Sequence, residues 1–95
     1  MADVPTDLPG HELVSGGLAD LAAGRDTEAA LLVAMAAPRL RALGYDVPEL
    51  AGGPPSHRLY ALLAADDRAG AHSRYNALVA RMTSFARAAE HASSR

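Results

Sequence analysis

The segment His72-Ser73-Arg74-Tyr75-Asn76 gathers more side chains capable of chemistry than any other stretch of the sequence. An imidazole can transfer protons near neutral pH, and a guanidinium can hold a phosphate or a carboxylate. The segment His57-Arg58-Leu59-Tyr60 offers the same residue types a second time. If the two segments lie on neighbouring helices, they form one candidate binding site. Its members are His57, Arg58, Tyr60, His72, Arg74, Tyr75 and Asn76.

Such a cluster is compatible with binding, catalysis or packing. Tyr and Arg are enriched among the residues that contribute most to protein–protein affinity, which favours an interface. A His and an Arg on one helix can also form a metal-independent ribonuclease site, which would make the chain a small helical enzyme or toxin. The same side chains can instead form a satisfied network that fixes helix packing, or a plain solvated surface. The sequence leaves these interpretations open and assigns no catalytic residue.

Metal and cofactor sites lack support in the spacing of the sequence. The chain has no cysteine, which excludes thiol catalysis, disulfides and Cys-ligated metals. No two of the four His stand three or four residues apart, so no helix turn presents a ready pair of ligands. His57 and His72 could meet if the starts of their helices lie side by side. Gly52-Gly53-Pro54-Pro55 lacks the Lys-Ser/Thr of a phosphate-binding loop. We therefore expect no metal and no cofactor.

The charge balance argues against nucleic acid as a partner. Nine basic residues, all of them Arg, face eleven acidic ones, and the net charge of −2 gives no broad positive field. One alternative remains, in which the last helix reads DNA with Arg74, Asn76 and Arg81. The longest apolar run, Ala29–Ala37, is far short of the roughly 20 residues that a membrane span needs. We expect a soluble cytoplasmic protein whose partner is a second copy of itself or another protein.

Composition and length predict one small all-α domain. The apolar residues are mostly Ala and Leu, which favour helices, whereas Ile and Trp are absent and there is a single Phe. Ninety-five residues suffice for one core only. We expect an irregular arm over residues 1–9, a helical domain over 10–91 and a frayed end over 92–95.

Hydrophobic periodicity predicts helices over 10–23, 26–43, 57–65 and 71–91. The apolar pattern continues through Pro38, which predicts a kinked second helix rather than two separate ones. Gly24 and Gly44 are stop signals, and Asp26 or Thr27 is a suitable N-cap for the second helix. Ser56 is a candidate N-cap for the third.

Two further patterns indicate how these helices pack. Gly16 and Gly17 either weaken the first helix or mark a close crossing with another one. In the third helix, Leu59, Leu62 and Leu63 form the predicted apolar face. In the last helix, apolar residues spaced 3, 4, 3 and 4 form a heptad seam, flanked at one edge by Val79 and Ala86. The seam residues are Tyr75, Leu78, Met82, Phe85 and Ala89.

The expected architecture is a compact bundle of about four helices, with the helix over 71–91 at its centre. Three helices with a loosely attached first segment are the alternative. An Ala-rich core buries little apolar area, so association would add stability. Together with the heptad seam of the last helix and the lack of a catalytic constellation, this favours a small interaction or regulatory module without catalytic activity of its own, with homodimerisation as one option.

Overall fold

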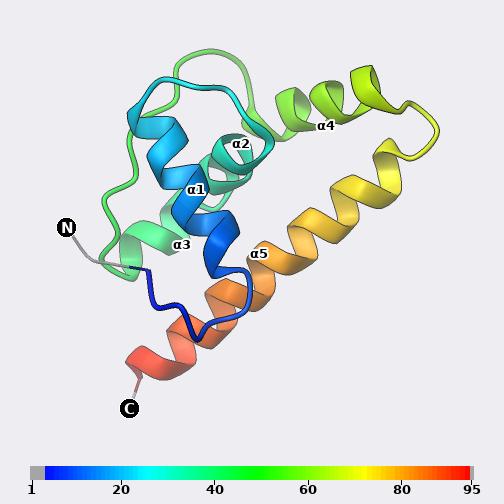
Figure 1. The fold of residues 1–95 in the computed structure, drawn as a ribbon. Coiled ribbons are helices and arrows are strands. Elements are labelled where there is room, and N and C mark those ends of the chain that lie inside the picture. The colour runs from blue at the N-terminus through cyan, green and yellow to red at the C-terminus, as the bar shows by residue number, and fades with distance from the viewer. Residues whose placement is uncertain (1–3, 95) are drawn as a thin grey trace.

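A computed structural model describes residues 4–94, which form five α-helices and no strand. They pack into a bundle with extents of 42 × 25 × 19 Å (Figure 1). The all-α prediction is thus confirmed. The helices are α1 (His11–Ala22), α2 (Glu28–Met35), α3 (Ala37–Ala42), α4 (Pro55–Asp66) and α5 (Ala71–Ser93). The parts of the expected arm and of the expected frayed end that fall on residues 1–3 and 95 lie outside the described residues.

The segment predicted as one kinked helix is divided into α2 and α3. The division falls at Ala36, which has φ −93° and ψ 8°. In a continuous helix the Pro38 ring would clash with the carbonyl of Ala34. In the structure Pro38 instead stands in the first turn of α3, where its missing N–H needs no partner. The chain therefore ends one helix before the proline and begins another.

Helix α2 is the most deeply enclosed element of the bundle. Residues 30–33 are consecutive and all buried, which a helix with a single buried stripe cannot achieve. Accordingly α2 contacts α1, α3, α4 and α5. Helix α5, which was predicted from the sequence to be the central helix, is the longest one and contacts α1, α2 and α4. It keeps one face in solvent along its whole length, so the centre of the core is α2.

The heptad seam of α5 packs in the core of its own chain, so it is not the surface that a partner would cover. Met82, Phe85 and Ala89 are buried, and the two earlier seam residues are half-buried. The Phe85 ring packs against that of Tyr45, with centroids 6.2 Å apart. Tyr45 is buried although it belongs to the connection between α3 and α4, which has no periodicity to reveal it. Helix α5 continues to Ser93, past the point at which fraying was expected.

Helix α4 differs from its prediction in two respects. It begins at Pro55 with Pro54 as its N-cap residue, so Ser56 is not the cap. Proline suits the first helical position because its φ is already helical and its missing N–H would be unpaired there. Leu59 and Leu63 are fully buried, but Leu62 is 38% exposed. The expectation for Leu62 was wrong because α4 packs mainly on α2 and α5, and this leaves it a narrow buried face.

The predicted stop and start signals of α1, α2 and α3 are confirmed. Gly24 and Gly44 have φ values of 76° and 98°, which glycine adopts without steric strain. Each closes a Schellman motif, in which the residue after the glycine donates to the carbonyl five residues earlier. The Thr27 hydroxyl caps α2 by accepting from the Ala30 N–H at 3.1 Å.

Of the two glycines in α1, only Gly17 marks a close helix crossing. It is buried, and a Cβ built on it would overlap the Ala29 carbonyl and a methyl group of Val33. A Cβ on Gly16 would meet no atom within 4 Å. Gly17 therefore lets the backbones of α1 and α2 approach more closely than any other residue would allow. The two adjacent glycines thus have different roles.

Substituting each glycine by alanine should change stability in opposite directions. Gly17→Ala should lower the free energy of unfolding, because overpacking costs about 1–3 kcal/mol and the gain in helix propensity of about 1 kcal/mol offsets only part of it. Gly16→Ala should raise it by up to about 1 kcal/mol, because only the propensity gain applies. Urea denaturation of both variants measures the difference. Equal effects would show that α1 and α2 do not cross closely at Gly17.

Candidate functional site

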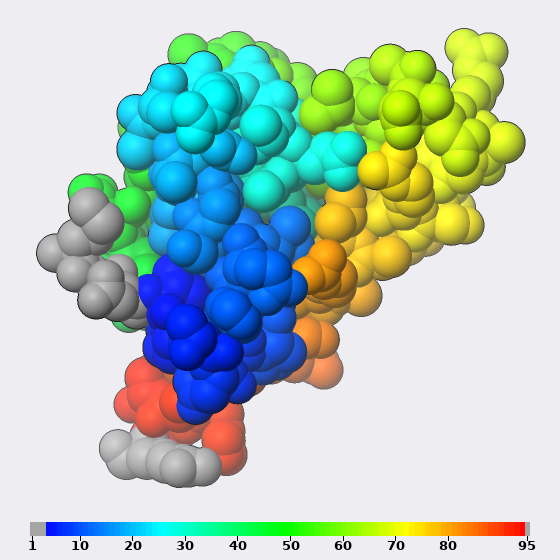
Figure 2. Space-filling model, in the orientation of Figure 1, coloured from blue at the N-terminus to red at the C-terminus, as the bar shows by residue number. Residues whose placement is uncertain are grey.

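Helices α4 and α5 form an antiparallel hairpin that carries the sequence-predicted site. They are joined by the short turn over residues 67–70 and diverge from it as the two arms of a V (Figure 1). The tip of this V projects from the body of the molecule (Figure 2). Because the hairpin is antiparallel, the start of α5 lies at the tip and the start of α4 lies away from it. The suggestion that His57 and His72 meet at neighbouring helix starts is therefore wrong.

The hairpin brings together four of the seven predicted site residues. The Tyr60 ring lies 5.6 Å from that of Tyr75 and 6.5 Å from the imidazole of His72, centroid to centroid. The Asn76 amide nitrogen is 3.2 Å from Nε2 of His72. Tyr60, His72 and Asn76 are exposed and Tyr75 is half-buried. We call these four residues the aromatic cluster.

The other three predicted residues have different surroundings. Arg58 donates to the carboxylate of Asp26 and to the carbonyl of Ala51. Arg74 forms ion pairs with Glu28 at 3.2 Å and with Asp66 at 3.0 Å. His57 is exposed near the start of α4. Both arginines thus attach the hairpin to the start of α2 and the segment before it.

The geometry gives the enzyme and DNA-binding alternatives no specific support. None of the seven residues lines the pockets that we describe below, and the aromatic cluster lies on an exposed surface. Between residues 4 and 94, no polar or charged residue is buried and no group of three or more His, Asp or Glu side chains could hold a metal. The guanidinium of Arg81 is 2.6 Å from the Glu12 carboxylate. DNA would have to displace carboxylates from Arg74 and Arg81, two of its three proposed readers.

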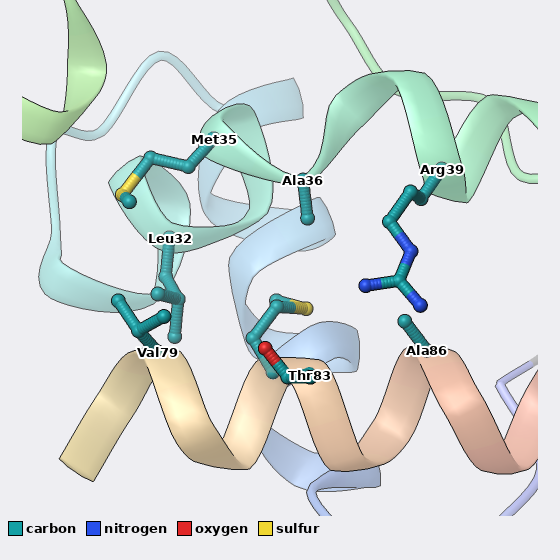
Figure 3. A pocket seen from close by; sticks show the side chains of 8 residues that line it. Leu32, Met35, Ala36, Arg39, Val79, Thr83 and Ala86 are labelled. Atoms are coloured by element: carbon teal, nitrogen blue, oxygen red, sulfur yellow. The ribbon is translucent and has the colours of Figure 1, made fainter. Parts of the chain in front are cut away.

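A more distinctive feature is an apolar groove between α2–α3 and α5, with α1 behind it (Figure 3). Its volume is about 180 Å³, and only two of its lining residues, Arg39 and Thr83, are polar. The other lining residues are Leu32, Met35, Ala36, Val79, Met82 and Ala86. Met35 and Val79 are half-buried, so apolar side chains remain accessible here. We call this feature the α2–α5 groove.

A bidentate ion pair closes one end of the α2–α5 groove. Arg39 donates through Nη2 and Nε to the two carboxylate oxygens of Glu90, at 2.7 and 3.0 Å. These hydrogen bonds lower the pKa of the Glu90 carboxyl and raise the pKa of the Arg39 guanidinium. The pair joins α3 to α5 across the groove and fixes a charged group beside an apolar surface. A site of this kind can orient a polar group of a ligand whose apolar part enters the groove.

Sequence reasoning missed this groove as a site. The available signal was the edge of the heptad seam, where Val79 and Ala86 make the apolar face of α5 wider than one contact requires. The break at Ala36 then turns α3 so that Arg39 reaches α5 (Figure 3). Hydrophobic periodicity predicted a continuous helix through Ala36. It therefore could not show that the Arg39 side chain reaches α5.

A second, larger hollow lies under Leu62 and is acidic. Its volume is about 590 Å³, and it is shallow and widely open to solvent. Each of its carboxylates is paired with an arginine, among them Asp20 with Arg25 at 2.8 Å and Asp66 with Arg74. The ion pairs neutralise the field that a cationic ligand would need, so this hollow is a poorer candidate site than the α2–α5 groove.

No known protein family, curated protein or solved structure matches the chain. Among the described helices, none combines the length and the apolar character needed to cross a membrane. The candidate site therefore has to be interpreted from its own geometry.

Three carboxylates, those of Glu12, Asp20 and Glu90, should make the stability fall at acid pH. The Thr27 hydroxyl, followed by Arg25, lowers the pKa of Asp20, and Arg39 lowers that of Glu90. A hydrogen bond from its own backbone, followed by the charges of His11 and Arg81, lowers the pKa of Glu12.

As the pH falls below about 4.5, the unfolded chain therefore binds more protons than the folded one, and stability is lost. Thermal melting between pH 7 and 3 should give a constant Tm down to about pH 5 and a falling Tm below it. Glu90→Gln should make the acid limb shallower. Glu49→Gln, which removes a carboxylate that is 93% exposed, controls for the loss of one charge. An acid limb identical in Glu90→Gln and the unsubstituted protein would contradict the role of the Arg39–Glu90 pair.

Proposed function

We propose that this chain is a non-catalytic, cytoplasmic protein-interaction module that binds a helix of a partner protein in the α2–α5 groove. The observation that carries this proposal is the groove itself, an accessible surface with six apolar residues in its lining and a fixed ion pair beside it. The occupant is a helix because the groove runs alongside α5, and an amphipathic helix inserts apolar residues into such a groove at regular spacing.

The size of the groove favours side chains of a protein over a small molecule. Pockets for drug-sized ligands typically have volumes of about 300–1,000 Å³ and enclose most of the ligand. The α2–α5 groove has about 180 Å³ and is open along one side. Met35 and Met82 line it, and the flexible methionine side chain adapts readily to an incoming apolar group.

The thin core supplies a thermodynamic reason for a partner. Five of the 17 buried apolar residues are alanines, which bury little area each. A chain of this size already buries a smaller fraction of its surface than larger domains do. A helix in the groove would cover half-buried side chains such as Val79 and so stabilise the folded chain by mass action.

Site-specific photo-crosslinking in cells tests this proposal. A benzophenone amino acid at Thr83, in the groove, should give a discrete adduct. The same group at Ser15, exposed on α1 away from the groove, should give none. A second substitution, Met35→Lys, should abolish the adduct because it places a charge in the groove, while the melting curve shows that the chain still folds. Absent adducts, or equal adducts from both positions, would contradict the proposal.

A further inference from the structure

The α2–α5 groove and the aromatic cluster belong to one continuous surface of α5. Six residues with spacings of 4, 3, 4, 4 and 3 fall within an arc of about 80° around the helix axis, at 100° per residue. We call them the α5 strip: His72, Asn76, Val79, Thr83, Arg87 and Glu90. The strip starts in the aromatic cluster, passes along the groove and ends at the Arg39–Glu90 ion pair.

The two ends of this surface differ in chemistry. One end carries the rings of Tyr60 and Tyr75, whose faces attract cations, with the imidazole of His72 beside them. The other end carries two guanidiniums, those of Arg39 and Arg87, against the single carboxylate of Glu90. Arg87 is exposed and forms no ion pair with any residue of the range 4–94. The middle is small and weakly polar, so another helix can approach it closely.

We propose that the occupant of the groove is a second copy of this chain, whose α5 packs antiparallel against the α5 strip about a two-fold axis. This inference rests on the proposed function. An antiparallel two-fold arrangement pairs residues whose numbers have a constant sum. With the axis between Val79 and Thr83, Val79 meets the partner's Thr83 and His72 meets the partner's Glu90. Tyr75 is then in register with the partner's Arg87, and Asn76 lies one residue away from that position, which places each aromatic cluster near the charged end of the other copy.

The charges decide between this arrangement and a parallel one. In a parallel dimer identical residues face each other, so Arg87 would meet the partner's Arg87 and the aromatic clusters would meet each other. The antiparallel arrangement instead brings cations to aromatic rings and an imidazole to a carboxylate at both ends. A two-fold interface is isologous, so a single self-complementary surface is sufficient for it.

The dimensions predict a weak dimer. From His72 to Glu90 the strip is about 27 Å long at 1.5 Å per residue. With a width of two helices, the contact covers about 500 Å² on each copy, which is at the lower limit of specific interfaces. Association should therefore depend on concentration in the micromolar range and above. A test of dimerisation must therefore cover this range of protein concentration.

The absence of native cysteine permits a direct test of the pairing. Val79→Cys and Thr83→Cys chains are mixed under mild oxidation, and the disulfide products are separated by mass. With equal amounts of the two chains, random pairing gives twice as much mixed disulfide as either self-linked product, so the antiparallel dimer predicts a mixed product clearly above that twofold ratio. Ser15→Cys should cross-link only at the background rate. An excess of the self-linked Val79→Cys product would overturn the antiparallel arrangement, and background cross-linking throughout would overturn the dimer.

Sedimentation velocity from about ten to several hundred micromolar supplies a second measurement on the unsubstituted chain. The average mass should rise with concentration. Arg87→Glu should raise the dissociation constant by about tenfold, whereas Arg87→Lys, which retains the cation, should change it by less than about threefold. A monomer at every concentration would overturn the dimer. If Thr83 then still cross-links to a different protein in cells, the interaction function stands and only its assignment to a second copy fails.

Discussion

The close crossing of α1 and α2 is the contact on which the remaining structure depends. Gly17 has no side chain to separate the two helices, so the carbonyl of Ala29 and the side chain of Val33 lie directly against the α1 backbone. This approach encloses α2 on a face that would otherwise meet solvent. Helices α4 and α5 cover other faces, and four consecutive residues of α2 become buried as a result. An Ala-rich chain with a single Phe forms a core in this way, through short distances between backbones rather than through large side chains.

Three arginine ion pairs connect α5 to the other helices. Arg39, Arg74 and Arg81 each join α5 to another helix through an ion pair. Individually, exposed pairs of this kind contribute about 0–1 kcal/mol and weaken with salt. Their more important effect is geometric, because each pair restricts the relative position of two helices, and the bidentate Arg39–Glu90 pair also fixes their orientation. All basic residues of this chain are arginines. This composition has the structural consequence that several helix contacts are held by guanidinium–carboxylate pairs.

This use of the arginines also determines which surfaces remain available for binding. Arg58 and Arg74, two of the side chains best suited to phosphate binding, are committed to carboxylates near the start of α2. The aromatic cluster and the α2–α5 groove remain, and both are open, weakly polar and without a buried ionisable group. Surfaces of this kind are accessible to water, so they are better suited to binding another protein than to acid–base catalysis. Acid–base catalysis depends on groups whose pKa values are shifted by burial.

Much of the local structure followed from the sequence by itself. The helical class, the stop signals at Gly24 and Gly44, the cap at Thr27 and the apolar seam of α5 depend on interactions within a few residues or on one helical period, which a sequence displays directly. The candidate site was only partly predictable, because only part of it depends on such local interactions. The aromatic cluster forms because a short turn returns α5 along α4, and this could be anticipated. The commitment of Arg74 to Glu28, the burial of Tyr45 in an irregular segment and the exposure of Leu62 could not. Each depends on which element, distant in sequence, packs against it. The proximity of segments far apart in the chain leaves no periodic signal in the sequence.

The α2–α5 groove is the clearest case of a feature that the sequence did not reveal. The break at Ala36 and the approach of α5 create it together, so only the tertiary structure could show that the edge of the α5 seam remains accessible.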